Sequence, residues 1–310
     1  MKKALVSLAT VVAMSVPFTA HAERIGVAMS AFDDNFLTIL RTSMSSHAAG
    51  LKDVNVQFED AQLDVGKQLS QIQNFIAEKV DAIIVNPVDT DATPKMTRMA
   101  AAAGIPLVYV NRAPSDKTLP PKVSFVGSKE SQAGALQMQE VCRLMGGKGN
   151  ILIMMGDLAN QSARERTQAV KDVISKAPCN GIKIVDERSA RWTRTNAVDL
   201  MTNWLSAGLK FDAVVANNDE MALGAVQALK AAHKLDQKTI VAGIDATQDA
   251  LVALKAGDLK VTVFQNAVAQ GADAVDDALK LARGQKGEQT VWIPFELVTA
   301  GNMTQYLAKN

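Results

Sequence analysis

Ile151-Leu152-Ile153-Met154 is an uninterrupted apolar run, and it leads into the polar stretch Gly156-Asp157-Leu158-Ala159-Asn160-Gln161. A second run, Ala213-Val214-Val215-Ala216, leads in the same way into Asn217-Asn218-Asp219. Strands of a parallel sheet have this continuous apolar character because helices bury both of their faces. The two runs therefore predict buried parallel strands with polar side chains directly after their carboxyl ends.

The same alternation of short apolar strands and amphipathic helices extends over most of the chain. In the first half it predicts strands at 24–29, 54–58, 82–85 and 106–109, helices at 35–49, 65–78 and 92–103, and a helix C-cap at Gly104. In the second half it predicts strands at 150–154, 182–186, 213–216, 239–244, 260–263 and 291–295, with a final helix at 267–282. Two successive units of this kind predict an α/β fold with two Rossmann-like, doubly wound lobes. Ligands of open α/β sheets bind beyond the carboxyl ends of the strands, so two facing lobes would share one cleft.

The first 22 residues have the features of a secretory signal peptide. Two lysines precede an apolar run at 4–16, Pro17 breaks the run, and Ala20-His21-Ala22 places small residues at the positions that a signal peptidase reads. The apolar run is too short for a lasting membrane anchor. We therefore expect cleavage after Ala22 and a mature chain that acts outside the cytoplasm.

The composition is that of an ordinary globular protein, with 48% hydrophobic residues, 21% charged residues and a net charge of +1. This balance gives no reason to expect nucleic acid or an anionic membrane surface as a partner. His47 and His233 lie far apart and lack Cys, Asp or Glu at metal-ligand spacing, and no phosphate-binding loop or nucleophile elbow is present. We expect no metal, no cofactor and no catalytic constellation.

Cys142 and Cys179 are the two cysteines of the chain. An oxidising compartment permits a disulfide between them, and each is expected near the C-terminal end of a helix, just ahead of a strand. The bond also needs a suitable Cα separation, which a sequence does not supply. The bonded and the free states therefore both stay open at this point.

Asn, Asp, Arg and Gln side chains gather directly after the predicted strands, with two aromatic residues among them. Such a set suits a neutral polyol, because a vicinal pair of hydroxyls is best met by a carboxylate on one side and a guanidinium or amide on the other. The C–H faces of a sugar or cyclitol ring are apolar, so Phe36 and Trp192, one from each lobe, could hold the ring between them. Asp219 is expected to cap the helix that follows it. Secondary candidates for ligand contacts are Ser30, Asn86 and Asn160.

Three stretches resemble the periplasmic binding proteins of monosaccharide ABC importers, whose nearest members are the ribose, galactose/glucose and inositol (rhizopine-type) receptors. They are Phe32-Asp33-Asp34-Asn35-Phe36, Ser162-Ala163-Arg164-Glu165-Arg166-Thr167 and Ala216-Asn217-Asn218-Asp219-Glu220-Met221-Ala222-Leu223-Gly224-Ala225. The resemblance covers essentially the whole mature chain. It implies Phe36 and Trp192 as stacking residues. It also implies a set of hydroxyl partners: Asp34, Asn111, Arg112, Arg166, Asn218, Asp245 and Gln265.

The resemblance implies the type I fold of this family, in which two lobes joined by three crossovers close on the ligand like a flytrap. The expected N-terminal lobe takes residues 23–126 and 266–290, and the expected C-terminal lobe takes 127–265 and 291–310. The implied partners are a small neutral sugar or cyclitol, the membrane permease of an ABC importer and, for a sensory role, a chemoreceptor. The receptor itself is expected to be a monomer.

One position departs from the galactose/glucose type, which carries His and Asp where this chain has Asn160 and Ser162. The departure argues against a hexopyranose, and the run at 157–161 looks more like the inositol receptors. The sequence therefore favours a receptor that captures a myo-inositol-like cyclitol, with ribose, galactose or glucose as alternative ligands. A sugar-modifying enzyme on the same lobes is the alternative class of function. Its one candidate acid–base pair is Asp34 with Asp245, and we predict that the chain is not an enzyme.

Overall fold

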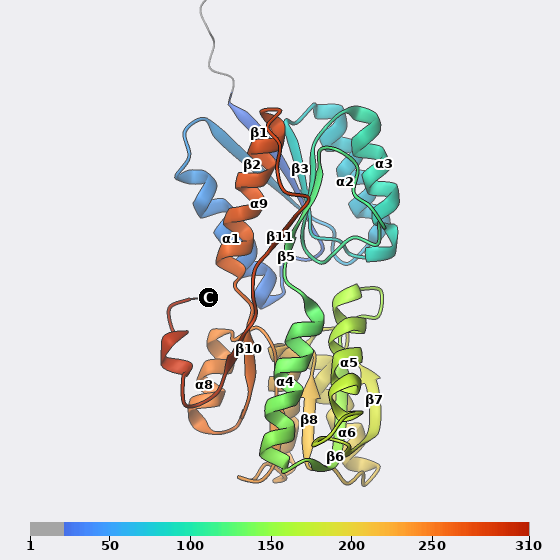
Figure 1. Ribbon diagram of the computed structural model, residues 1–310, viewed down its shortest axis with the longest axis vertical. Coiled ribbons are helices and arrows are strands. Elements are labelled where there is room, and N and C mark those ends of the chain that lie inside the picture. Colours follow the sequence, from blue (N-terminus) through green and yellow to red (C-terminus); the bar gives the residue numbers. More distant parts are fainter. Residues whose placement is uncertain (1–21, 310) are drawn as a thin grey trace, which may run out of the picture.

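The computed structural model describes residues 22–309, and within them the chain forms two lobes stacked end to end (Figure 1). The predicted signal peptide, residues 1–22, lies outside the described residues except for Ala22. Each lobe is built on a parallel sheet that carries helices on both faces. The predicted two-lobed α/β fold is confirmed.

The first lobe contains a six-stranded sheet with the order β11-β5-β4-β3-β1-β2, in which all neighbours are parallel. Its strands are β1 (Glu23–Met29), β2 (Val54–Asp60), β3 (Ala82–Val85), β4 (Leu107–Asn111), β5 (Val123–Gly127) and β11 (Thr290–Trp292). One face is covered by α1 (Asn35–Ala49) and α9 (Ala267–Ala282), and the other by α2 (Val65–Glu78) and α3 (Thr93–Ala103). A short 3₁₀ helix, η1 (Thr90–Ala92), precedes α3. The lobe is thus completed by α9 and β11, which come from the far end of the chain (Figure 1).

Local sequence signals set the ends of the helices in this lobe. The Asp34 side chain accepts a hydrogen bond from Leu37 N and caps α1, and Asp64 caps α2 through Lys67 N. Gly104 ends α3 with a φ of 72°, a left-handed conformation that glycine adopts at little cost. Because α1 begins directly after β1, its N-terminus lies at the carboxyl ends of the strands.

The second lobe contains a four-stranded parallel sheet with the order β7-β6-β8-β9 and a two-stranded antiparallel pair, β10–β12. Its strands are β6 (Lys148–Met155), β7 (Gly181–Ser189), β8 (Ala213–Ala216), β9 (Ile240–Ala242), β10 (Thr262–Phe264) and β12 (Glu296–Val298). On one face lie α4 (Glu130–Met145) and α5 (Gln161–Ile174), and on the other α6 (Arg194–Ser206), α7 (Asp219–Ala231) and α8 (Gln248–Ala256). The chain ends near a second 3₁₀ helix, η2 (Met303–Gln305). Gly134 lets α4 and α5 approach closely, since a Cβ there would lie 2.3 Å from the backbone oxygen of Arg166.

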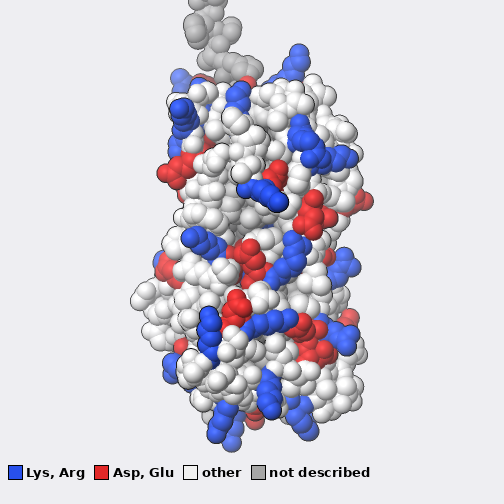
Figure 2. Space-filling view, turned by 45° about the vertical axis from the view of Figure 1, so that its right-hand side comes forward, with Lys and Arg blue, Asp and Glu red and all other residues white. Residues whose placement is uncertain are grey.

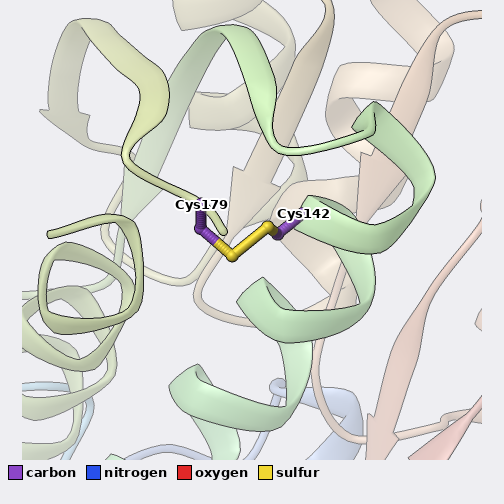
Figure 3. The surroundings of a disulfide bond; sticks show 2 residues. All are labelled: Cys142 and Cys179. Atoms are coloured by element: carbon purple, nitrogen blue, oxygen red, sulfur yellow. A yellow bond between two sulfur atoms is a disulfide. The ribbon is translucent and has the colours of Figure 1, made fainter. Parts of the chain in front are cut away.

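Cys142 and Cys179 form a disulfide bond with their Cα atoms 5.7 Å apart (Figure 3). Cys142 lies in the last turns of α4, and Cys179 lies in the turn before β7. Both side chains are buried in the apolar cluster that α4 and α5 form with the sheet. The bond therefore ties a helix to the edge strand of the second lobe.

The chain passes between the lobes three times within residues 22–309: between β5 and α4, between β10 and α9, and between β11 and β12 (Figure 1). The prediction of one strand at 291–295 is wrong, because this segment is the third crossover. Thr290–Trp292 pairs with β5 in the first lobe, whereas Glu296–Val298 pairs with β10 in the second. Pro294 lies between the two strands and has no N–H for a continuous ladder.

The face shown in Figure 2 carries Lys and Arg side chains interspersed with Asp and Glu, in keeping with the net charge of +1. No helix within residues 22–309 has both the length and the apolar character needed to cross a membrane. The same residues contain no group of three or more His, Cys, Asp or Glu side chains that could hold a metal ion.

Candidate ligand-binding site

Side chains from both lobes line a small pocket in the cleft, which we call the inner pocket. Its lining residues are Asp34, Phe36, Leu37, Asn111, Arg112, Ser162, Arg166, Trp192, Asn218, Asp245 and Gln265. The inner pocket has a volume of about 30 Å³ and adjoins an outer hollow of about 680 Å³. Both are lined by Asp34, Leu37, Arg112 and Trp192, and the outer hollow also by Asp33, Asn35, Asp157, Arg191 and Glu220. The structure thus brings all nine residues that the resemblance implies around one pocket.

The two sheets bring these residues together because each follows the carboxyl end of a strand. Asn111 is the last residue of β4, and Arg112 comes directly after it. Further residues follow the strands of the second lobe: Trp192 comes after β7, Asn218 after β8, Asp245 after β9 and Gln265 after β10. Strands of both lobes end at the same cleft, so side chains far apart in the sequence converge there.

Left-handed backbone conformations occur at three of the pocket residues. The φ angle is 67° at Asn111, 70° at Trp192 and 125° at Asp245. Such conformations are uncommon outside glycine and are strained for a residue as bulky as tryptophan. The Trp192 ring also lies against Gly156, where a Cβ would come within 2.2 Å of the ring. The left-handed backbone at Trp192 and the missing side chain at Gly156 together hold the indole ring in a defined position.

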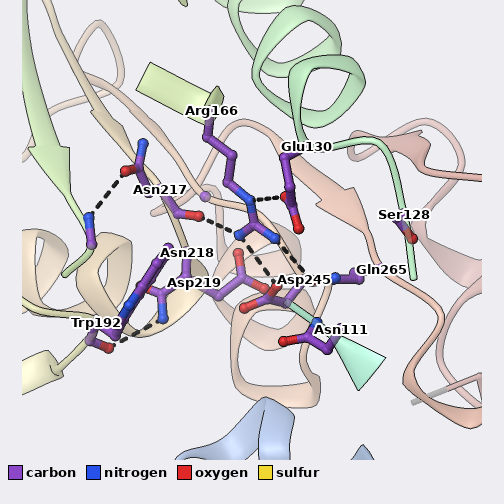
Figure 4. Close-up of polar contacts among 12 residues, drawn as sticks. Asn111, Ser128, Glu130, Arg166, Trp192, Asn217, Asn218, Asp219, Asp245 and Gln265 are labelled. Carbon is purple, nitrogen blue, oxygen red and sulfur yellow. Dashed lines mark hydrogen bonds and ion pairs between the residues drawn. The ribbon is translucent and has the colours of Figure 1, made fainter. Parts of the chain in front are cut away.

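The buried guanidinium of Arg166 is hydrogen-bonded through all three of its nitrogens (Figure 4). Nε donates to Glu130 Oε2 at 2.5 Å, Nη1 to Asn217 O at 2.7 Å and Nη2 to Gln265 Oε1 at 3.0 Å. Asp245 Oδ1 lies 3.9 Å from Nη1. Burial lowers the pKa of Arg166, but the carboxylates of Glu130 and Asp245 raise it by more. Burial raises the pKa of Asp245 well above its usual value, although Arg166 opposes this shift.

Asp34 and Arg112 supply a second carboxylate and a second guanidinium to the pocket, from the first lobe. Arg112 Nη1 donates to Pro87 O at 2.8 Å, and burial lowers the pKa of Arg112 to about 10 although Asp34 opposes the shift. Burial raises the pKa of Asp34, while the hydrogen bond from Leu37 N and the charge of Arg112 lower it. The inner pocket is therefore lined by two carboxylates, two guanidiniums and three amide side chains.

Asp219 is a buried acid behind the pocket. Burial raises its pKa to about 7, although its carboxylate accepts hydrogen bonds from Thr247 N at 2.9 Å and Thr262 Oγ1 at 2.7 Å. The prediction that Asp219 caps α7 is wrong. Asn218 is the cap, because its backbone is extended and its Oδ1 accepts from Met221 N at 3.0 Å.

Ser30 and Asn86, two of the secondary candidates, lie behind the wall of the inner pocket. Ser30 Oγ donates to Asn86 Oδ1 at 2.6 Å, and Asn86 Nδ2 donates to Asn111 Oδ1 at 3.3 Å. Asn111 Nδ2 in turn donates to Gln270 Oε1 at 3.3 Å, and Gln270 Nε2 donates to Ser128 Oγ at 3.1 Å. This buried polar network fixes the orientation of the Asn111 amide.

Asn160, the third secondary candidate, lines the outer hollow and bridges the lobes. Its Oδ1 accepts from Trp192 Nε1 at 2.7 Å, and its Nδ2 donates to Val88 O in the first lobe at 2.7 Å. Beside it, Thr90 N and Thr90 Oγ1 donate to Ala159 O at 3.1 and 3.0 Å. Trp192, which would cover the ligand ring, is thus hydrogen-bonded to Asn160, and Asn160 in turn is hydrogen-bonded to the first lobe.

Other side-chain contacts also join the lobes away from the crossovers. Asn35 Nδ2 donates to Glu220 Oε1 at 2.7 Å, and Arg164 Nη2 lies 3.2 Å from Asp91 Oδ1. Direct contacts at several points of the rim show that the lobes are closed on the cleft.

Glu130 is a site residue that the sequence pattern does not point to, because it follows a strand that is not predicted. β5 is absent from the strands that the sequence predicts, so the pattern assigns no site role to the polar residues after it. A signal is present nonetheless: Val123-Ser124-Phe125-Val126 is a short, mostly apolar run rich in strand-forming residues that ends at Gly127, and Ser128-Lys129-Glu130 follows. A strand at 123–127 places Glu130 shortly after its carboxyl end, where the polar residues of the cleft are expected.

Comparison with known proteins shows similarity along the whole chain. Residues 25–286 match the family described as periplasmic binding protein domain. A Rhizobium meliloti protein named "Putative rhizopine-binding protein" is 55% identical over 311 residues, which cover 100% of both chains. A solved ABC transporter solute binding protein from Bacillus halodurans C-125 with bound myo-inositol is 45% identical, has a TM-score of 0.88, and is matched over 94% of this chain and 99% of that chain. The Caulobacter myo-inositol binding protein bound to myo-inositol is 28% identical, with a TM-score of 0.86 and a match over 94% and 97% of the two chains.

Proposed function

The chain belongs to the periplasmic binding protein family of ABC sugar importers, and from this membership we propose that its ligand is a cyclitol of the inositol type. It is a solute-binding protein of an ABC transporter for sugars or cyclitols, and the relatives described above are binding proteins rather than enzymes. Two of these relatives hold myo-inositol, which supports the choice of ligand class.

The composition of the inner pocket is the observation that carries this proposal. Its two carboxylates and two guanidiniums offer acceptors and donors that suit the hydroxyls of a neutral ring. Asn111, Asn218 and Gln265 add amide donors and acceptors to the same wall. Phe36 and Trp192 offer apolar faces from opposite lobes. A cyclitol suits this wall because it presents hydroxyls all round its ring and apolar C–H faces above and below.

We propose that the ring lies between Phe36 and Trp192, where the inner pocket joins the outer hollow. The inner pocket alone, at about 30 Å³, has room for about one water molecule, so the ring must also occupy the adjoining part of the outer hollow. Entry then requires the lobes to part at the crossovers. In this proposal residues 23–127 with 266–292 move as one body, and residues 128–265 with 293–309 move as the other. These limits differ slightly from the expected 126 and 290, because Gly127, Val291 and Trp292 pair within the first sheet.

We further propose that the protein is exported by a signal peptide cleaved after Ala22, acts in the periplasm as a monomer, and delivers its ligand to a membrane permease. The basic start, the apolar run and the small residues before position 23 support export. A ligand that contacts both lobes favours the closed form, because differential affinity shifts the equilibrium between the two forms. The permease, or a chemoreceptor in a sensory role, would read the surface that closure creates.

A thermal-shift and calorimetric screen tests the ligand class. The ligands are myo-inositol and scyllo-inositol on one side, and ribose, galactose and glucose on the other. Myo-inositol is expected to raise the melting temperature in proportion to the logarithm of its concentration above Kd, while the hexoses do not. If ribose or a hexose raises the melting temperature and neither inositol does, the proposal of a cyclitol ligand is wrong. Ligand recovered from the protein in altered form would instead support the enzymatic alternative.

A further inference from the structure

We infer that Glu130 is a positioning residue that acts through Arg166 and links the inner pocket to the three crossovers between the lobes. The inference rests on the proposed function, since it takes the inner pocket as the ligand site. Glu130 does not line that pocket. It is the first residue of α4, directly after the crossover from β5, and its side chain is 1% exposed. Any effect on the ligand must therefore pass through a neighbour, and that neighbour is Arg166.

The Arg166 guanidinium contacts all three crossovers. At the first it donates from Nε to Glu130 Oε2 at 2.5 Å, and at the second it donates from Nη2 to Gln265 Oε1 at 3.0 Å. At the third, its central carbon lies 5.7 Å from the ring centroid of Phe295, between β11 and β12. A single side chain in the wall of the inner pocket thus contacts residues that lie within or directly after each of the three crossovers.

The same guanidinium faces the groups that would hold the ligand. Its central carbon lies 5.7 Å from the centroid of the Trp192 ring, and its Nη1 lies 3.9 Å from Asp245 Oδ1. A guanidinium is planar and rigid, so fixing Nε also fixes the directions in which both Nη atoms donate. Bending at the crossovers therefore turns the donors that line the pocket. By the same coupling, a ligand that holds those donors restrains the crossovers.

Glu130 is the carboxylate that sets this orientation. Asp245, the other acid beside Arg166, lies beyond hydrogen-bond distance at 3.9 Å. Glu130 Oε1 has no hydrogen-bond partner in the part of the chain that the structure describes, so the side chain is held through Oε2 and Arg166. Gly134, one turn further along α4, brings α4 against the backbone of Arg166 and keeps the two side chains within reach.

Hydrogen exchange of the ligand-free protein tests the link to the crossovers. Glu130→Gln keeps the shape of the side chain and removes its charge. The matched control is Glu140→Gln, on the same helix, whose carboxylate binds Nε and Nη2 of Arg143 away from the pocket. Glu130→Gln is expected to speed exchange about tenfold or more at 265–267 and 293–295, the second and third crossovers, and Arg166→Lys is expected to do the same. Glu140→Gln is expected to change neither segment. A change confined to the first turn of α4 would overturn the inference.

Calorimetry with myo-inositol tests the link to the ligand. Glu130→Gln is expected to weaken binding about tenfold or more, and the double variant with Arg166→Lys is expected to bind within about threefold of Arg166→Lys alone, because both changes act through one group. If the loss of affinity in the double variant equals the product of the losses in the two single variants, Glu130 does not act through Arg166. Unchanged affinity in Glu130→Gln would show the same. If the parent protein fails to bind myo-inositol, the proposed ligand fails while the exchange experiment still decides the role of Glu130. If Glu130→Gln does not fold, Glu130→Asp takes its place in both measurements, since it keeps the charge and withdraws the carboxylate by one methylene.

Discussion

Trp192 is a residue at which ligand binding and fold stability can be separated. Its side chain is partly buried, rests on Gly156 and donates from Nε1 to Asn160. Trp192→Ala is expected to weaken myo-inositol binding by about 2 kcal/mol, roughly thirtyfold, because the apolar face that covers the ring is lost. Calorimetry measures the affinity, and the ligand-dependent change in tryptophan fluorescence should disappear in the same variant.

Trp204 is the matched control for this prediction, because it is 4% exposed in the core of the second lobe and donates to Asp186 Oδ2 at 2.8 Å. Trp204→Phe is expected to lower the melting temperature and to leave the affinity unchanged. Trp192→Phe keeps a ring but loses the donor to Asn160, so its affinity should lie between those of the parent and Trp192→Ala. A large drop in the melting temperature of ligand-free Trp192→Ala, with little effect on affinity, would show that the residue serves the core.

Asp219 makes the stability of the ligand-free protein depend on pH. Its pKa is raised to about 7 in the folded state by burial, whereas an unfolded chain has the ordinary value of 3.8. At a pH between 3.8 and about 7, Asp219 therefore keeps its proton in the folded protein but has lost it in the unfolded chain. The contribution of Asp219 to the free energy of unfolding falls as the pH rises from about 4 to about 7, by about 1.4 kcal/mol per pKa unit of difference.

Urea unfolding of the ligand-free protein at pH 5 and pH 8 measures this effect, and Asp219→Asn should lose less stability between the two values than the parent. Asp236→Asn is the control, since Asp236 is exposed and its hydrogen bonds to Thr239 and Lys238 lower its pKa, so that it stays ionised throughout this range. An equal loss of stability between pH 5 and pH 8 in the parent and in Asp219→Asn would show that Asp219 is not the source of the pH dependence.

Sequence patterns identify which positions reach the cleft, but they do not assign the role of each side chain. Asn218 and Asp219 are neighbours, and either can cap a helix. Which one does so depends on where the helix begins, and a shift of one residue reverses the roles. Ser30 and Asn86 also follow strands, yet they bond to each other behind the pocket wall, where Asn86 also bonds to Asn111. Such differences depend on the packing of three neighbouring strand ends, which no local pattern contains.

At the scale of the elements, the disulfide is a defined source of stability in the second lobe. It joins positions 37 residues apart, so the chain-entropy account gives about 2–4 kcal/mol for the bond. The double variant Cys142→Ala with Cys179→Ala is expected to lose about this much free energy of unfolding in urea. Cys142 lies about 18 Å along α4 from Glu130, so myo-inositol affinity should stay within about threefold of the parent. If the double variant loses affinity but not stability, the disulfide serves the binding site and not the stability of the second lobe.

Elements with strong local signals could be predicted to the residue. α1, α2 and α9 have the expected bounds because a capping side chain marks each start, and β3 and β8 because they are short apolar runs between polar residues. The sequence does not predict β5, because its apolar run is short and is interrupted by Ser124. The segment at 291–295 was misread because a crossover and a strand have the same apolar composition, and the difference depends on which sheet each half pairs with.

At the scale of the whole molecule, the order of strands in the first sheet could not be derived from local patterns. β11 joins β5 only after the chain has passed through most of the second lobe, and α9 returns to pack beside α1. Such pairings depend on contacts between residues far apart in sequence. The family resemblance, and not the periodicity, led to the expectation of three crossovers.

The closed form depends on contacts at the rim of the cleft as well as on the ligand, and Thr90 allows this to be tested. Its Oγ1 donates to Ala159 O at 3.0 Å and accepts from Gln161 N at 3.1 Å and from Arg164 Nη2 at 3.3 Å. One hydroxyl thus makes three hydrogen bonds across the cleft although it does not line the inner pocket. Thr90→Val keeps the shape and removes these bonds. It is expected to disfavour closure by about 1–2 kcal/mol and to weaken myo-inositol binding about tenfold, because the ligand must then supply the difference.

Small-angle scattering should show that the ligand-free Thr90→Val protein is more extended than the parent and that saturating ligand restores the compact form. The matched control is Thr97→Val, in the same lobe, whose hydroxyl bonds to the Tyr109 hydroxyl at 2.8 Å within the core. That variant should lose thermal stability while its affinity and its compactness stay at the parent values. If Thr90→Val binds myo-inositol as tightly as the parent and has the same scattering profile, the rim contacts do not contribute to closure, and the ligand alone determines how the lobes meet.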